Sequence, residues 1–251
     1  MKMLNRIFRK NEVLFAILWI VAYVVLVSAA DNLSVEMGVE KLITVPVCGL
    51  LTGILVIWMK KNKLFERYGL CAPQIRAGKL WYYLPLVLLA SVNLWFGVAL
   101  NLSPLESMLY VVSMLFVGFL EEIIFRGLLF KAMEKDGLKA AVIVSSLTFG
   151  IGHLVNLVNG SGADLFSNLL QVGYAIAAGF AFTMLFYRSK SLWACMITHG
   201  VVNALSVFAN EKAMTPGREM FSAAMLAVIA LVYGGYLVRV EPAAKTEKSA
   251  E

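Results

Sequence analysis

Long apolar runs occupy most of this chain of 251 residues. An α-helix needs about 17–25 such residues to cross a bilayer, and eight runs of roughly that length are present. Continuous runs such as Val13 to Ala30 exclude a membrane β-barrel, whose strands are short and alternate between apolar and polar residues. The sequence therefore predicts an all-α, polytopic membrane bundle of about eight helices. The runs cover residues 13–30, 42–59, 80–100, 107–130, 138–158, 165–187, 191–209 and 220–238.

The composition leaves little length for anything outside the membrane. Hydrophobic residues make up 60% of the chain and charged residues 15%, and the mean hydropathy is +0.79. We expect one transmembrane helical domain over residues 1–240 and a disordered cytoplasmic tail over residues 241–251. The net charge of +6 is spread over short loops and forms no aromatic-interleaved patch, so no nucleic-acid partner is predicted. Three cysteines at unrelated spacings predict no disulfide framework, and we expect Cys48 and Cys195, inside apolar runs, to be packing residues.

Loop charges predict the orientation. If the N-terminus lies inside, 18 of the 22 basic residues fall on the inner side. The outer loops then hold only Lys41, Lys212 and Arg218, and Arg126 lies within a span. The positive-inside rule thus places both termini in the cytoplasm of a multi-pass protein of the cell (plasma) membrane.

Two segments allow more than one interpretation. The first run could be a cleavable signal peptide, but its length exceeds a usual signal core and favours a retained helix. The segment from Lys60 to Lys79 mixes basic and apolar residues. It can lie along the inner membrane surface or form a solvated loop.

Acidic residues inside the fourth run indicate chemistry, because charged groups in a membrane span are costly. Glu122 and Arg126 are four residues apart and can pair on one helical face, a role that could be purely structural. Glu121 is turned by about 100° from Glu122 on the helix. It has no such partner, so it is a candidate general acid or base.

The only two histidines of the chain, His153 and His199, also lie in apolar runs. His153 follows Phe149 by four residues, and Asn203 follows His199 by four, so each pair shares a helical face. A lone histidine of this kind is usually an interhelical hydrogen-bonding residue. Together with Glu121, the two histidines predict one joint site. Their depths, counted at about 1.5 Å per residue, fit one cavity opening to the cytoplasm.

Taken in order, Glu121-Glu122-xxx-Arg126, Phe149-xxx-His153 and His199-xxx-Asn203 resemble the motifs of the CPBP family of intramembrane proteases. That family includes the type II CAAX prenyl endopeptidases, the Abi proteins, and bacteriocin-processing or immunity proteins similar to lysostaphin resistance protein A. The resemblance covers residues 119–203 and implies hydrolysis of a peptide bond within or at the membrane.

The resemblance also implies roles for the motif residues. Glu121 would activate a water held by His153, while His199 and Asn203 would stabilise the tetrahedral oxyanion; Glu122 would pair with Arg126 and fix the helix. Glu121, His153 and His199 could instead hold a divalent metal such as zinc, although no HExxH motif is present. We expect water activation by glutamate without an obligatory metal.

Three functions compete at this stage. The first is an endopeptidase acting on a peptide, a membrane protein or a lipidated C-terminus in the bilayer. The second is a non-catalytic immunity or scaffold protein of the same family. The third, a proton-coupled transporter, is disfavoured because no internal repeat is evident. The sequence leaves the substrate and the oligomeric state open.

Overall fold

The computed structural model describes residues 1–74, 80–159, 162 and 164–239. Within this part the chain forms helices and loops with no β-strand, which confirms the predicted all-α class. The predicted tail, residues 241–251, lies outside the described residues, and the division into one domain stays a prediction. The elements are α1 (Lys2–Lys10), α2 (Glu12–Glu36), α3 (Thr44–Lys61), η1 (Leu80–Tyr83), α4 (Leu84–Ala90), η2 (Val92–Leu94), α5 (Pro104–Glu121), the π-helix η3 (Glu122–Phe130), α6 (Lys131–Glu134), α7 (Leu138–Gly152), η4 (His153–Leu157), α8 (Leu165–Ser189), α9 (Trp193–Leu205), η5 (Ser206–Phe208), η6 (Glu211–Ala213) and α10 (Pro216–Arg239).

Six helical segments of the described chain are long and apolar enough to cross a membrane. Four of them are the single helices α2, α3, α8 and α10. The fifth is the continuous segment formed by α5, η3 and α6, and the sixth is formed by α7 and η4. The predicted helical membrane bundle is therefore confirmed, whereas the predicted count of eight is not. The run at 191–209 forms a shorter apolar helix over Trp193–Phe208.

The run at 80–100 does not form the continuous helix that its hydropathy predicts. It breaks into η1, α4 and η2, and then becomes irregular. Polar groups explain the break, because Asn93 Nδ2 donates to the carbonyl of Val202 at 2.6 Å and the backbone N–H of Ala99 donates to the carbonyl of Phe208 at 2.9 Å. Gly97 has a φ of +99°, which also ends regular helix. Tertiary hydrogen bonds to the end of α9 thus replace helical ones.

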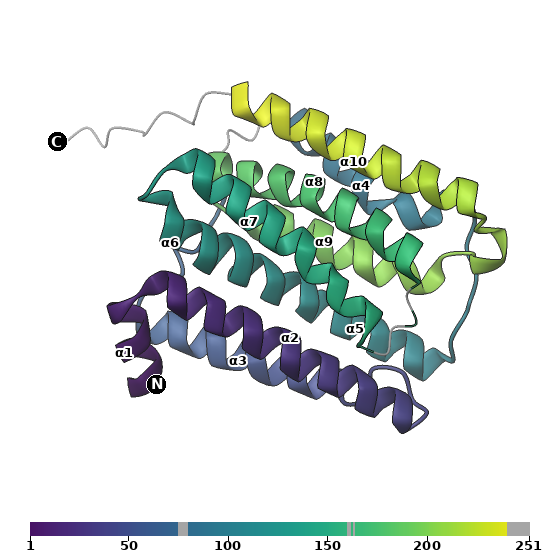
Figure 1. Ribbon diagram of the computed structural model, residues 1–251, viewed down its shortest axis with the longest axis horizontal. Coiled ribbons are helices and arrows are strands. Elements are labelled where there is room, and N and C mark those ends of the chain that lie inside the picture. Colours follow the sequence, from purple (N-terminus) through teal and green to yellow (C-terminus); the bar gives the residue numbers. More distant parts are fainter. Residues whose placement is uncertain (75–79, 160–161, 163, 240–251) are drawn as a thin grey trace.

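The long helices lie side by side, with α8 packed against α7 and α10, and α5 packed against α9 and α3 (Figure 1). The helix α2 packs against η3 and α3. Figure 1 places α1 and the end of α10 at one end of the bundle, and the loop between α2 and α3 and the start of α5 at the other. We call these the terminal end and the distal end.

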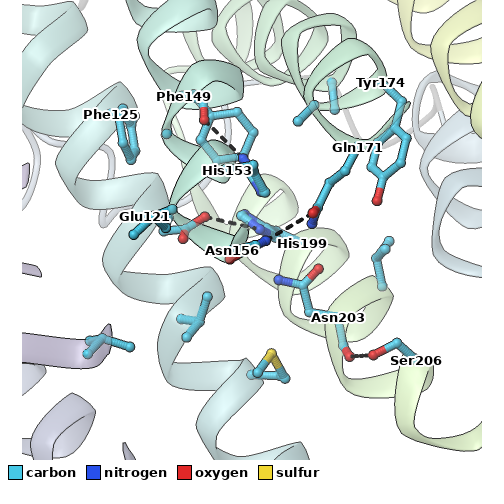
Figure 2. A pocket seen from close by; sticks show the side chains of 18 of the residues that line it. Glu121, Phe125, Phe149, His153, Asn156, Gln171, Tyr174, His199, Asn203 and Ser206 are labelled. Carbon is cyan, nitrogen blue, oxygen red and sulfur yellow. Dashed lines mark hydrogen bonds and ion pairs between the residues drawn. The ribbon is translucent and has the colours of Figure 1, made fainter. Parts of the chain in front are cut away.

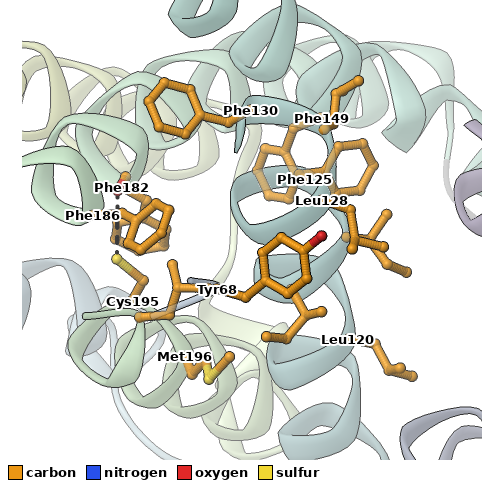
Figure 3. Packing of buried hydrophobic residues seen from close by; sticks show 14 of the residues in the cluster. Tyr68, Leu120, Phe125, Leu128, Phe130, Phe149, Phe182, Phe186, Cys195 and Met196 are labelled. Carbon is orange, nitrogen blue, oxygen red and sulfur yellow. Dashed lines mark hydrogen bonds between the residues drawn. The ribbon is translucent and has the colours of Figure 1, made fainter. Parts of the chain in front are cut away.

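Aromatic and aliphatic side chains fill the centre between α2, η3, α7, α8 and α9 (Figure 3). The rings of Phe125 and Phe149 meet edge to face with centroids 5.3 Å apart. Every residue of the π-helix η3 is buried, including its charged ones. Because π-helices are rare and concentrate at functional sites, this buried segment directs attention to the acids at its start.

Candidate active site

The buried pair of Glu122 and Arg126 anchors the site. Arg126 Nη1 donates to Glu122 Oε1 at 3.0 Å, and both side chains are fully buried. The guanidinium also lies over the ring of Phe149, 4.0 Å from its centroid. A cation on an aromatic face gains electrostatic stabilisation, and more so where water is excluded. The pairing that the four-residue spacing predicts is therefore present, and Phe149 completes the surroundings of the cation.

The imidazole of His199 lies between the two adjacent acids. Its Nδ1 is 2.8 Å from Glu122 Oε1, and its Nε2 is 3.5 Å from Glu121 Oε2. Because consecutive residues point in directions about 100° apart on a helix, an imidazole between them can face one acid with each nitrogen. Glu121 and Glu122 are thus joined through a residue of α9.

Two glycines permit this contact between α5 and α9. A Cβ atom added to Gly118 would lie 2.6 Å from the backbone nitrogen of Gly200 and 2.8 Å from its Cα. Larger residues would separate the two helices. The close approach brings His199, one residue before Gly200, within reach of Glu121 and Glu122.

The ring of His153 is oriented by a hydrogen bond to the preceding helix, α7. His153 follows α7, and its Nδ1 lies 3.0 Å from the carbonyl oxygen of Phe149. A carbonyl only accepts hydrogen bonds, so Nδ1 carries the hydrogen and a neutral His153 keeps Nε2 as an acceptor. The ring of Phe149 lies edge-on to both histidines, with centroids 5.1 Å from His153 and 5.6 Å from His199. One aromatic side chain therefore spaces the two imidazoles.

The contact with Glu122 fixes one hydrogen of His199. Nδ1 faces a carboxylate oxygen, which can only accept, so Nδ1 carries a hydrogen. The other ring nitrogen, Nε2, faces Glu121.

A cavity of about 360 Å³ brings the predicted catalytic side chains together (Figure 2). Glu121, His153, His199 and Asn203 all line it, as do Phe149 and Phe125. Glu122 and Arg126 do not; they lie behind the wall. In Figure 2 Asn203 lies one turn beyond His199 on the same helix, as its spacing predicts. The single predicted cavity is present, but its lining extends toward the distal end.

Tyr23 is a site residue that sequence reasoning missed. Its hydroxyl donates to Glu121 Oε1 at 2.6 Å, and it lines the cavity. It comes from α2, 98 positions before Glu121. A tyrosine within an apolar run carried no signal of this contact. The other carboxylate oxygen, Oε2, has no hydrogen-bond partner among the described residues. This buried oxygen faces Nε2 of His199 at 3.5 Å.

The residues considered for a metal do not form a ligand set in this structure. Among the described residues, no group of three His, Cys, Asp or Glu side chains is placed to hold a metal ion. We therefore derive no chemical step through a metal.

Comparison with known proteins finds two matches, and both fall on part of the chain only. Residues 103–205 match the family model "Rce1-like: Type II CAAX prenyl endopeptidase Rce1-like". A curated protein, "Putative membrane peptidase YdiL" of Bacillus subtilis (strain 168), is 36% identical over 101 residues. The segment matched by the family model includes all three of the motifs, from Glu121 to Asn203, so the similarity is to membrane peptidases over the motif segment.

The match to this relative is partial. It covers 40% of the chain and 36% of the relative's length. No solved structure shows significant similarity to the chain. The matched segment from 103 to 205 contains all four predicted catalytic residues, whereas Tyr23 lies outside it.

Proposed function

We propose that this protein is an intramembrane endopeptidase that hydrolyses a peptide bond with a water activated by Glu121. The family matches support a CAAX-type intramembrane protease at the level of the family. The observation that carries the proposal is the convergence of Glu121, His153, His199 and Asn203 on one cavity. The substrate is a peptide, a membrane protein or a lipidated C-terminus, and the protein resides in the plasma membrane.

The proposed reaction begins with water between Glu121 and His153. Glu121 Oε2 accepts one proton of the water, and Nε2 of His153 accepts a hydrogen bond from the other. The water oxygen forms a bond to the carbonyl carbon of the substrate, and the carbonyl electron pair moves to its oxygen. Tyr23, through Oε1, keeps the carboxylate of Glu121 in the orientation that this transfer needs.

The resulting oxyanion lies toward α9 in this scheme. Nε2–H of His199 and the side-chain amide of Asn203 donate to it, each worth about 2.7–4 kcal/mol in comparable sites. Glu122 and Arg126 hold His199 in place from behind. The C–N bond then breaks as Glu121 returns its proton to the leaving nitrogen, which gives a carboxylic acid and an amine. The acid passes its remaining proton to the amine, so a carboxylate and an ammonium group are released.

Purified protein in detergent provides the test, using a library of quenched fluorescent peptides. We expect wild-type protein to cleave members of the library and Glu121→Gln to be inactive while it keeps its thermal unfolding midpoint. Glu106→Gln is the matched control, because Glu106 lies on α5 but belongs to an exposed capping box with Ser103. If Glu121→Gln also keeps its full biological effect in cells, the scaffold function replaces the protease.

We further propose that no metal is obligatory. The expected outcome is unchanged cleavage after incubation with EDTA and with 1,10-phenanthroline, because the proposed base is a carboxylate that needs no metal to accept a proton. Zn²⁺ is added back as a control. Activity that disappears with chelators and returns with Zn²⁺ would refute the metal-free mechanism while retaining the protease.

A further inference from the structure

The cavity of the proposed protease reaches one end of the bundle only. From Glu121 its lining continues along α2, α5, α7 and α9 to residues at the distal end. Figure 1 shows the loop between α2 and α3, the start of α5 and the start of α10 at that same end. The lining residues nearest this end are Asp31, Lys41, Tyr110, Asn159 and Ser206.

Packed side chains close the cavity toward the terminal end. Phe125, Phe149 and Phe182 line its inner limit, and each is at most 4% exposed. Behind them lie Glu122 and Arg126, with no exposed surface. The buried π-helix η3 continues from there to the terminal end. A substrate therefore has a path to Glu121 from the distal end and none through this layer.

Basic residues are concentrated at the terminal end. Of the described lysines and arginines, Lys41, Lys212 and Arg218 lie at the distal end and Arg126 lies in the centre. All the others lie on α1 or near the terminal ends of the long helices and their loops. The positive-inside rule then places the terminal end in the cytoplasm. The distal opening of the cavity then faces the opposite, extracytoplasmic side. The expectation of a cavity that opens to the cytoplasm therefore conflicts with a cytoplasmic terminal end.

The distal half of the cavity has charged and polar side chains among apolar ones such as Val92, Met114 and Val202. Lys41 Nζ and Asp31 Oδ1 are 2.9 Å apart at the rim, with side chains 12% and 15% exposed. Thr44 Oγ1 also donates to Asp31 Oδ1. Charged groups at this position favour a rim in contact with water, because unsolvated charges within lipid are costly.

Amide and hydroxyl groups continue from the rim toward Glu121. Asn156 Nδ2 donates to Gln171 Oε1 at 2.9 Å, and the hydroxyls of Tyr110 and Ser206 are 2.9 Å apart. Such groups can hydrogen-bond to the backbone of an extended peptide.

From the closed terminal end, the distal opening and the charge distribution, we infer that the substrate is a peptide or a membrane-protein segment exposed on the extracytoplasmic side of the membrane. It reaches Glu121 through the distal half of the cavity, where polar side chains line its path. A lipidated C-terminus on the cytoplasmic side would be separated from Glu121 by the buried side chains of Phe125, Phe149 and Phe182. The identity of the reaction rests on the proposed function, but the side of access does not.

Cysteine labelling in intact cells tests the side of access without any need for activity. The background is Cys71→Ser, which leaves the buried Cys48 and Cys195. Ser28→Cys places a thiol on the cavity wall, and Lys135→Cys places one on an exposed loop at the terminal end. A membrane-impermeant maleimide should modify Ser28→Cys in intact cells, and Lys135→Cys only after permeabilisation.

The opposite labelling pattern would overturn the inference, as would a Ser28→Cys thiol that reacts only after permeabilisation or not at all. A second measurement uses a quenched fluorescent peptide that the detergent-solubilised protein cleaves. Right-side-out vesicles should cleave it at least about tenfold faster than sealed inverted vesicles. Faster cleavage by inverted vesicles would overturn the side of access and leave the protease intact. If the solubilised protein cleaves no peptide, the proposed function fails, and the labelling alone decides the access.

Discussion

His199 joins the acids of α5 and η3 into a single unit. Glu122 Oε1 accepts from both Arg126 and His199, while the other imidazole nitrogen faces Glu121. The two acids therefore have different environments: Glu122 is fully buried and faces a guanidinium and an imidazole, and Glu121 borders a cavity. This asymmetry supports the proposed division of roles, with Glu121 as the base and Glu122 as the support of His199.

Replacing Tyr23 with phenylalanine should lower kcat by about 10- to 100-fold with little change in KM. The hydroxyl donates to Glu121 at 2.6 Å, and a hydrogen bond to a charged group is worth about 1.5–3 kcal/mol. Steady-state kinetics on a cleaved peptide give the two constants. Tyr233→Phe is the matched control, since its hydroxyl is also buried but donates to the carbonyl of Tyr82, away from the cavity. Equal effects of the two substitutions would mean that Tyr23 acts only on stability.

Arg126→Met should destabilise the protein by about 3–5 kcal/mol, because it leaves Glu122 buried without its cation. The comparison is Arg67→Met, which removes the ion pair between Arg67 and Glu12. The side chain of Arg67 is 40% exposed. That change should cost only about 0–1 kcal/mol. Unfolding in mixed micelles, followed by circular dichroism, measures both. Similar losses for the two variants would contradict the structural role of the buried pair.

Sequence alone predicted the contacts that depend on helical spacing. The pair of Glu122 and Arg126 follows from a separation of four residues, and Asn203 follows His199 onto the same wall for the same reason. The contact of His199 with both acids was not predictable, because it depends on how closely α5 and α9 approach. The hydrogen bond from Tyr23 likewise spans 98 positions and has no local signal.

The crossing of α5 and α9 fixes the geometry between base and oxyanion donors. A side chain at Gly118 would collide with the backbone of Gly200. Gly118→Ala should therefore destabilise the protein by about 1–3 kcal/mol, and a shift of about 1 Å between Glu121 and His199 should lower activity by roughly 100-fold.

The control for this crossing is Gly173→Ala on α8. A Cβ atom there meets nothing within 4 Å, so the exchange should leave activity intact and gain about 0.5–1 kcal/mol of helix stability. Activity assays and unfolding curves for the two variants give the comparison. If Gly118→Ala retains wild-type activity, the close helix crossing is not required for the site.

The segment from Leu80 to Ser103 shows where hydropathy fails as a guide to helices. Its apolar residues predict a span, yet Asn93 bonds to Val202 of α9 and the backbone N–H of Ala99 bonds to Phe208 of η5. Hydropathy measures burial and not which hydrogen bonds are made, so it could not distinguish a broken segment from a helix. The six long apolar helical segments, in contrast, were predictable because their length and composition suffice.

In the molecule as a whole, the cavity is lined both by the segment that carries the motifs and by helices outside that segment. Residues 103–205 carry the family match and all four proposed catalytic side chains. The helix α2 lies outside that segment but contributes Tyr23, Ser28 and Asp31 to the cavity. Its apolar run therefore contributes side chains to the cavity as well as a long apolar helix to the bundle.

The central claim is that Glu121 delivers water to a peptide bond inside this cavity. The direct test is mass spectrometry of cleavage products formed in H₂¹⁸O by wild-type protein, Glu121→Gln and the Glu106→Gln control, all reconstituted in liposomes. We predict one ¹⁸O atom in the new carboxylate of the product from wild type and Glu106→Gln, and no product from Glu121→Gln. Labelled product from Glu121→Gln at the wild-type rate would contradict the claim.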